Sequence, residues 1–225
     1  MTTALLILSL VLNVLFATFV IAFWLQRVKI FHRVIHEIDA RAAMTFFDTY
    51  SVAPADMVFL GDSITAGGHW TEMFPGLSVR NRGISGDRTV DVLKRLDQVT
   101  AGKPAKLFLM IGTNDIGLGV PGEETVRNYA AILDKLTQAS PQTRIYVQSV
   151  LPREPKAYDD VLALNAVISE MAQARGLPYL DFLPAFVGED GGIRPSLSYD
   201  RLHLSGEGYR LWQSLLEPYA TDLSE

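Results

Sequence analysis

Hydrophobic positions along the chain fall into one long run, followed by short apolar runs that alternate with helical patterns. Residues 4–25 carry no charged side chain, and about 20 consecutive apolar residues are enough to cross a bilayer as a helix. A cleaved signal peptide is the alternative, and it would carry positive charge before an apolar core of about 7–15 residues. Because no basic side chain precedes this run, residues 1–25 are predicted to form an uncleaved transmembrane anchor.

Basic residues follow the apolar run directly, at Arg27, Lys29 and Arg33. Because the cytoplasmic flanks of membrane helices carry an excess of Lys and Arg, this charge bias predicts that the rest of the chain lies on the cytoplasmic side. The opposite orientation stays open, since many N-terminal anchors export the domain that follows them. The protein is therefore expected to be a single-pass membrane protein, held in the inner or plasma membrane if the organism is a bacterium.

The segment between the anchor and the first strand, residues 26–53, is predicted to be a connecting helix and linker. Apolar residues recur at helical spacing and mark one face of this helix, namely Phe31, Val34, Ile35, Ile38 and Ala42. Pro54 ends the pattern. A separate globular domain is expected over residues 54–225, a length within the usual range for a single domain.

Strand and helix patterns alternate through residues 54–225 with short connections. Strands are predicted at 57–60, 77–81, 106–111, 144–150 and 177–180, and the apolar runs at 57–60 and 106–111 are expected to be buried. Helical periodicity is found at 89–97, with Val90, Leu93 and Leu96 facing inward, and at 123–139, 160–175 and 205–219. The predicted fold class is therefore α/β, a flavodoxin-like three-layer α/β/α sandwich with a mainly parallel sheet. Ligands of such sheets bind beyond the carboxyl ends of the strands.

Composition excludes several classes of protein. The formal net charge is −5 and no long basic run is present, so nucleic acid is not expected as a partner, because phosphate binding needs clustered Lys and Arg. The absence of cysteine excludes disulfides, thiolate metal sites and cysteine nucleophiles. His32 and His36 lie at i,i+4 spacing without an evident third ligand, so a membrane-proximal helix face is preferred over a metal site. No metal ion and no organic cofactor are expected.

Two polar clusters could supply a nucleophile and a base. Ser63 lies in Gly61-Asp62-Ser63 directly after the first predicted strand, where a turn into a helix would aim its hydroxyl into the crevice. Near the C-terminus, Asp200 precedes His203 by a spacing that lets the carboxylate hold one ring nitrogen and leaves the other free to act as a base. Each cluster has a purely structural alternative: a capped turn for the first, and a surface loop with an incidental histidine for the second.

Two further clusters could supply hydrogen-bond donors to a developing negative charge. Gly86 lies in a loop at 81–87 after the second predicted strand, where glycine lets a backbone N–H approach a substrate closely. Asn114 lies in the segment 112–115 after the third strand, and its amide can donate a hydrogen bond to an oxyanion without adding charge. A capped loop and an Asx turn are the structural alternatives.

Taken in order along the chain, the four clusters resemble the blocks that identify the SGNH (GDSL) hydrolase superfamily by a Ser, a Gly, an Asn and a His. The resemblance covers roughly residues 56–219 and is closest to the branch that contains the platelet-activating-factor acetylhydrolase alpha subunits. The stretches that resemble this branch are NRGISGDRTVDVLKRL at 81–96, IGTND at 111–115, Leu151-Pro152-Arg153, and LHLSGEGY at 202–209. The anchor and the helix that follows it lie outside the resemblance.

The resemblance implies roles for individual residues. Ser63 would be the nucleophile, and His203, oriented by Asp200, would be the general base and then the general acid. The oxyanion would be held by the backbone N–H groups of Ser63 and Gly86 and by the Asn114 side chain. The implied function is a serine ester hydrolase of the esterase, lipase or acetylhydrolase type, which works through an acyl-serine intermediate on a lipid-derived or acetylated-sugar ester.

Two alternatives use the same sequence features. An acyltransferase or thioesterase would use the same triad with a different acceptor or leaving group. A catalytically inactive, membrane-tethered binding protein would keep the fold without the chemistry, although the intact key residues count against it. Arg82, Arg88 and Trp70 are expected near the mouth of the pocket, without an assigned role, and the sequence does not indicate an oligomeric state.

Overall fold

The computed structural model describes residues 2–222, although the side chains of residues 2, 4, 25 and 28–33 lie outside the described part. Sequence predictions that depend on Lys29, Phe31, His32 and Arg33 therefore fall outside the described side chains. The chain divides into two compact units, Met1–Ala42 and Ala43–Glu225.

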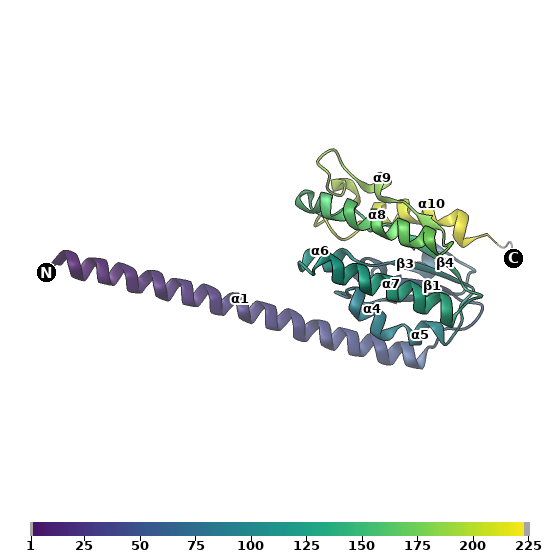
Figure 1. Ribbon diagram of the computed structural model, residues 1–225, viewed down its shortest axis with the longest axis horizontal. Coiled ribbons are helices and arrows are strands. Elements are labelled where there is room, and N and C mark those ends of the chain that lie inside the picture. Colours follow the sequence, from purple (N-terminus) through teal and green to yellow (C-terminus); the bar gives the residue numbers. More distant parts are fainter. Residues whose placement is uncertain (1, 223–225) are drawn as a thin grey trace. The chain divides into compact units, whose positions relative to one another are not determined.

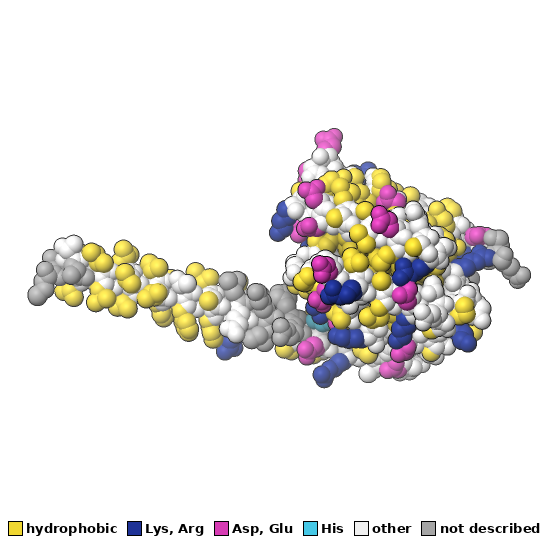
Figure 2. Space-filling model, viewed as in Figure 1, with side chains coloured by type: hydrophobic (Ala, Val, Ile, Leu, Met, Phe, Trp, Pro, Cys, Tyr) yellow, Lys and Arg dark blue, Asp and Glu magenta, His cyan; other side chains and the backbone are white. Residues whose placement is uncertain are grey.

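Helix α1 (Thr2–Thr49) covers both the predicted anchor and the predicted connecting helix. Within it, the 20 residues Leu5–Trp24 are exposed, and they are long and apolar enough to cross a membrane. Figure 2 shows the hydrophobic side chains along this part of α1. A signal sequence would satisfy the same criteria of length and composition. Further along α1, the apolar residues Val34, Ile35 and Ile38 are exposed as well, so the predicted apolar face is not buried.

The second unit is built around a parallel sheet, and its described residues form five strands in the order β2-β1-β3-β4-β5 (Figure 1). The strands are β1 (Met57–Gly61), β2 (Val79–Gly83), β3 (Lys106–Met110), β4 (Arg144–Gln148) and β5 (Tyr179–Leu180). All neighbouring pairs are parallel, which confirms the predicted α/β class and parallel sheet. The chain reverses its direction of progress between β1 and β3, and in such sheets ligands bind beyond the carboxyl ends of the strands at this switch point.

Helices cover both faces of the sheet. One face packs against α4 (Thr89–Arg95), α5 (Asp97–Thr100), α7 (Gly122–Ala139) and α8 (Tyr158–Ala174). The other face packs against α3 (Trp70–Met73), α9 (Leu183–Phe186) and α10 (Gly206–Ala220). Short helices within the loops are α2 (Ser63–Ala66), α6 (Thr113–Gly117), η1 (Pro155–Ala157) and η2 (Pro195–Leu197).

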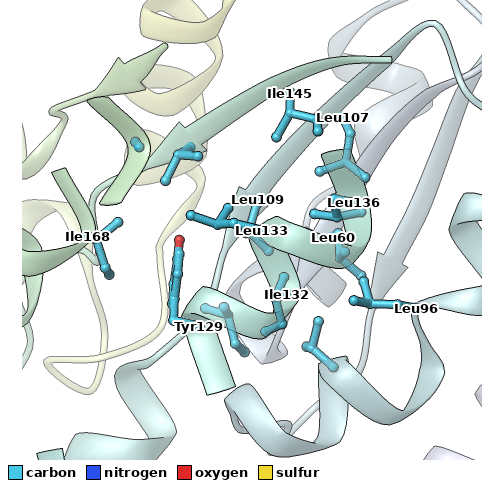
Figure 3. Close-up of a cluster of buried hydrophobic side chains, with 14 of the residues drawn as sticks. Leu60, Leu96, Leu107, Leu109, Tyr129, Ile132, Leu133, Leu136, Ile145 and Ile168 are labelled. Atoms are coloured by element: carbon cyan, nitrogen blue, oxygen red, sulfur yellow. The ribbon is translucent and has the colours of Figure 1, made fainter. Parts of the chain in front are cut away.

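The apolar strand residues pack into two hydrophobic clusters, one on each face. Figure 3 shows the cluster on the α7 face, where Leu60 and Leu109 from the strands lie near Tyr129 and Leu133 from α7. All four side chains are fully buried, and burying one leucine stabilises a fold by about 1.5–3 kcal/mol. This packing gives the carboxyl ends of β1 and β3 a rigid support.

Two residues expected near the mouth of the pocket are buried inside the domain, so neither lines an opening to solvent and that prediction is wrong for both. Trp70 is 2% exposed, and its ring stacks on Phe59 with the centroids 3.7 Å apart. The Arg82 guanidinium lies 4.4 Å from the Phe47 ring centroid and donates to the Tyr50 carbonyl oxygen at 2.5 Å. Trp70 is buried because large aromatic rings gain most from burial. The Arg82 guanidinium is held by the face of the Phe47 ring and by the Tyr50 carbonyl oxygen.

The face that α4 and the residue after it bury agrees with the predicted face only at Leu96. Val92 and Leu96 are fully buried, whereas Val90 and Leu93 are partly exposed. Arg95 is 4% exposed, because its guanidinium reaches hydrogen-bond acceptors inside the domain. An apolar pattern alone could not anticipate an arginine that points inward.

The third residue expected at the pocket mouth, Arg88, lies at the start of α4. Arg88 is partly exposed and stands at the N-cap of α4. Its Nε lies 3.0 Å from a carboxylate oxygen of Asp91 in the first turn, and this contact raises the pKa of Arg88. The side chain is therefore engaged with its own helix.

Candidate active site

Ser63 is the first residue of α2, directly after the turn that follows β1. Asp62 caps this helix, because its buried carboxylate accepts a hydrogen bond from the Ile64 N–H at 3.0 Å. The close approach of β1 to β3 and α2 requires a glycine at 61, since a Cβ there would lie 2.3 Å from both the Met110 carbonyl oxygen and Oγ1 of Thr65. The strand-to-helix turn thus holds the Ser63 hydroxyl at the carboxyl edge of the sheet.

The Ser63 hydroxyl meets the ring of His203, 140 positions further along the chain. Its Oγ lies 2.9 Å from Nε2 of His203, and Nδ1 of the same ring lies 2.6 Å from Oδ2 of Asp200. The side chains of His203 and Asp200 are 32% and 39% exposed, so this end of the site is open to solvent. The structure therefore brings together the three residues that the sequence analysis grouped as a triad.

A tight turn after Asp200 places the histidine. Oδ1 of Asp200 accepts hydrogen bonds from the N–H groups of Leu202 and His203, at 2.9 and 2.7 Å. Arg201 has a φ of 67°, a left-handed conformation that is uncommon for a residue with a side chain. Its guanidinium donates to the Ile193 carbonyl oxygen at 2.7 Å. Backbone strain of this kind persists where surrounding contacts determine the conformation. Here the hydrogen bonds of Arg201 and of the Asp200 carboxylate hold the turn that sets the carboxylate against the ring.

The Asp200 carboxylate is stabilised in its ionised form. Burial by itself would raise its pKa, but hydrogen bonds from the His203 ring and from two backbone N–H groups hold the pKa of Asp200 below its ordinary value. Asp200 therefore stays ionised at neutral pH, where a carboxylate on Nδ1 favours the tautomer whose Nε2 can take a hydroxyl proton.

Gly86 and Asn114 are connected through Asp87. Gly86 has a φ of 82°, a conformation that favours glycine, and its N–H has no hydrogen-bond acceptor among the described residues. Asn114 lies in α6, directly after β3, and donates from Nδ2 to the Asp87 carbonyl oxygen at 2.9 Å. Because a side-chain amide carries two N–H donors, the other one stays available to a ligand.

Two buried acids that the sequence analysis left without a role lie under the site. Asp115 accepts hydrogen bonds from the Thr89 N–H at 2.9 Å and from the Thr89 hydroxyl at 2.6 Å; burial raises the pKa of Asp115, and these bonds oppose the rise. Burial also raises the pKa of Asp62 to about 7, against the effect of its hydrogen bond from Ile64. The two acids attach the loops after β1 and β3 to the helices beside them.

Two more side chains hold these loops. Arg153, after β4, donates to the Thr113 carbonyl oxygen at 2.5 Å, directly before Asn114. The Tyr209 hydroxyl of α10 donates to the Ile64 carbonyl oxygen of α2 at 2.8 Å. Sequence reasoning assigned neither residue a role, although both lie in stretches that resemble the SGNH superfamily, and that resemblance was the available signal.

The site as a whole combines a hydroxyl, an imidazole and a carboxylate with two nearby loops that carry hydrogen-bond donors. In such an arrangement the imidazole can take the hydroxyl proton, and the donors can stabilise an oxyanion. Among the residues that the structure describes, no group of three or more His, Cys, Asp or Glu side chains is arranged to hold a metal ion. The chemistry that these groups can perform is nucleophilic acyl transfer.

Comparison with known proteins identifies the family. The GDSL-like lipase/acylhydrolase family matches residues 59–211. Platelet-activating factor acetylhydrolase IB subunit alpha1 from Homo sapiens is 34% identical over 165 residues, which cover 68% of this chain and 70% of the human one. The chain therefore belongs to the GDSL-like lipase/acylhydrolase family. It is an ester-cleaving hydrolase, and the resemblance seen in the four sequence blocks is confirmed.

Solved structures show the same fold. A protein from Streptococcus pneumonia named for platelet activating factor has a TM-score of 0.78 and 28% identity, over 88% of this chain and 99% of that one. A GDSL-like lipase from Bacteroides thetaiotaomicron has a TM-score of 0.66 and 28% identity, over 74% of this chain and 87% of the lipase. These similarities support the family assignment at the level of the fold.

Proposed function

We propose that the protein is a serine ester hydrolase that cleaves acyl esters through an acyl-serine intermediate. The observation that carries this proposal is the continuous chain of contacts from Ser63 Oγ to His203 Nε2, at 2.9 Å, and from His203 Nδ1 to Asp200, at 2.6 Å. A nucleophile and its base need contacts of this length, with a third group that orients the base.

The proposed reaction has two halves. Ser63 Oγ attacks the ester carbonyl carbon while His203 Nε2 takes the hydroxyl proton, and Asp200 stabilises the imidazolium that forms. The tetrahedral intermediate collapses, the alcohol leaves with the proton from His203, and the acyl group stays on Ser63. Water then attacks the acyl group while His203 takes a proton from it. Return of that proton to Ser63 releases the carboxylic acid, and no metal ion or organic cofactor takes part.

The negative oxygen of each intermediate is held by the N–H groups of Ser63 and Gly86 and by Nδ2 of Asn114. The first N–H groups of a helix have no acceptor within the helix, and Ser63 opens α2. The Gly86 N–H is without an acceptor among the described residues, and Asn114 uses one of its two amide hydrogens on Asp87. Donors of this kind act most strongly on charge that develops in the transition state.

The substrate class we propose is a small acyl ester on a lipid or on an acetylated sugar. The human relative is named as an acetylhydrolase of platelet-activating factor, which supports a short acyl group on a lipid. The exposed apolar helix segment Leu5–Trp24 would keep the enzyme close to lipid substrates.

Labelling with a fluorophosphonate probe tests this function. The full-length protein in detergent is expected to acquire the phosphonyl group of the probe on Ser63, as identified by peptide mass spectrometry, and to lose its hydrolysis of p-nitrophenyl acetate in parallel. Heat-denatured protein is the control, because its serine has lost the base that activates it. A folded protein that neither reacts with the probe nor hydrolyses the ester would be a tethered binding protein instead.

We also propose that Leu5–Trp24 anchors the protein as a single membrane-spanning helix, with the second unit on the cytoplasmic side. The length and apolar composition of this segment support an anchor. Arg27, Lys29 and Arg33 directly after it support the orientation.

Membrane fractions from cells that express the full chain are expected to retain the protein after an alkaline carbonate wash, with its N-terminal residues still attached. Protease added from the cytoplasmic side is expected to digest the second unit. A shortened protein that the wash releases would identify a cleaved signal sequence, and protection from protease would reverse the orientation.

A further inference from the structure

Arg95, the last residue of α4, joins three segments beneath the proposed site. Its Nε donates to Oδ2 of Asp87 at 2.7 Å. Its Nη2 donates to the carbonyl oxygens of Gly61 and Arg82, at 3.0 and 2.9 Å. Gly61 ends β1, two residues before the proposed nucleophile, and Arg82 lies near the end of β2. Asp87 directly follows Gly86, the glycine of the proposed oxyanion hole. One guanidinium therefore joins the end of β1, the end of β2 and the loop that follows β2.

Asp87 is held from two sides. Its carboxylate pairs with Arg95, and the side chains are 2% and 3% exposed, respectively. Its main-chain carbonyl oxygen accepts from Nδ2 of Asn114 at 2.9 Å. Charge-assisted hydrogen bonds in a buried, low-dielectric setting are strong and directional. The Arg95 contact thus holds Asp87, which directly follows Gly86 and whose carbonyl oxygen accepts from the Asn114 amide.

Stability alone does not account for this ion pair. Burial lowers the pKa of Arg95, although the charge and hydrogen bond of Asp87 oppose that effect. Buried ion pairs often add no stability in comparison with well-packed apolar residues of similar volume. An apolar residue could not donate hydrogen bonds to three acceptors from separate segments, as Arg95 does.

We propose that Arg95 is a positioning residue that, through Asp87, holds the Gly86 N–H and the Asn114 amide where they stabilise the oxyanion. Arg95 itself touches no substrate atom. The inference rests on the proposed function, because an oxyanion forms only when a nucleophile attacks the ester carbonyl.

Arg95→Lys in the full-length protein, kept in detergent, tests the inference. Lysine keeps the charge that pairs with Asp87, but a single nitrogen cannot replace a planar fork that reaches three acceptors. We expect kcat for p-nitrophenyl acetate to fall by about 10–100-fold, less than the loss of a whole oxyanion donor. KM is expected to change by less than about threefold, because the donors act on the transition state rather than on the bound ester.

Arg175→Lys is the matched control. Arg175 directly follows α8, and its guanidinium also pairs with an aspartate and a main-chain oxygen, since Nε donates to Oδ1 of Asp134 at 2.8 Å and Nη1 to the Met171 carbonyl oxygen at 3.0 Å. None of these partners belongs to the proposed site. We expect kcat of this variant to stay within about twofold of wild type. Equal falls in kcat for both variants would overturn the inference.

A double variant separates positioning from general destabilisation. Asn114→Ala alone is expected to lower kcat by about 10²–10³-fold. If Arg95 acts through the contact between Asp87 and Asn114, adding Arg95→Lys to this variant lowers kcat much less than it does in the wild type, because the donor is already missing. The same fold-change in both backgrounds would refute the part of the inference in which Arg95 positions the Asn114 amide.

Asp87→Asn is the second route if the Arg95→Lys protein does not fold. This change removes the charge but keeps the main-chain oxygen that accepts from Asn114, and the same pattern of lower kcat with little change in KM is expected. Hydrolysis that survives Ser63→Ala refutes the proposed function as a whole. An inactive Ser63→Ala protein alongside a fully active Arg95→Lys or Asp87→Asn protein refutes only the inference about Arg95.

Discussion

Ser63→Ala is expected to lower kcat for p-nitrophenyl acetate by about 10⁶-fold, because removing the nucleophile of a triad costs as much as removing the triad. The substitution deletes Oγ, which lies 2.9 Å from His203 Nε2, so no acyl-enzyme can form. The fold is expected to survive, because α2 is capped by the Asp62 carboxylate and not by the Ser63 hydroxyl. Residual hydrolysis should be first order in the ester, without the burst that an acyl-enzyme produces.

The measurement compares initial rates of full-length wild-type and variant proteins in the same detergent, together with their melting temperatures. Ser214→Ala is the matched control, because this exposed hydroxyl on α10 donates to the Leu211 carbonyl oxygen, away from the proposed site. The control is expected to keep full activity. A Ser63→Ala protein that retains a tenth or more of the wild-type kcat, about 10⁵-fold above expectation, would refute the nucleophile assignment.

Asp200→Asn is expected to lower kcat by about 10⁴-fold through the tautomer of the histidine. The wild-type carboxylate accepts from His203 Nδ1 at 2.6 Å and leaves Nε2 free to take the Ser63 proton. An asparagine that turns its amide nitrogen toward the ring donates to Nδ1, so the ring carries its proton on Nε2 and cannot act as the base. The amide oxygen still accepts from the Leu202 and His203 N–H groups, as the carboxylate does now, and the turn should persist.

Nitrogen NMR of the His203 ring gives a readout that loss of fold would not mimic. At pH 8 the wild-type protein is expected to carry the ring proton on Nδ1, and Asp200→Asn on Nε2. Asp97→Asn is the matched control, since Asp97 is exposed and pairs with Lys135 at 2.8 Å. Its kcat should stay within about twofold of wild type, because surface ion pairs contribute little. An unchanged tautomer and kcat in Asp200→Asn would remove Asp200 from the proposed mechanism.

Part of the candidate site could be predicted from local sequence. Ser63 and Asn114 each follow a short apolar run that forms a buried strand, β1 and β3. Parallel strands end at one edge of a sheet, so residues that follow two neighbouring strands must lie close together. His203 and Asp200 could be paired because a spacing of three residues allows a turn that joins their side chains.

The support of the site could not be predicted in the same way. Asp115 binds Thr89 across 26 positions, and Arg95 binds Gly61 across 34. Each of these polar residues is buried because its partner lies on another element. Periodicity reports which positions of one element face a core, but it carries no information about such partners, and for α4 it therefore favoured Val90 over Arg95.

The sequence by itself determined the alternation of strands and helices and the parallel sheet, because burial of one face imposes a period on each element. It also determined the family, because the four blocks around Ser63, Gly86, Asn114 and His203 keep their residue types. Only the tertiary structure decided the strand order β2-β1-β3-β4-β5 and the start of β2 at Val79, opposite Met57. It also decided that Trp70 belongs to the core, and that Ser63 and His203 are in contact. These features depend on which elements pack together, and that choice is made by the free energy of the whole core rather than by any local pattern.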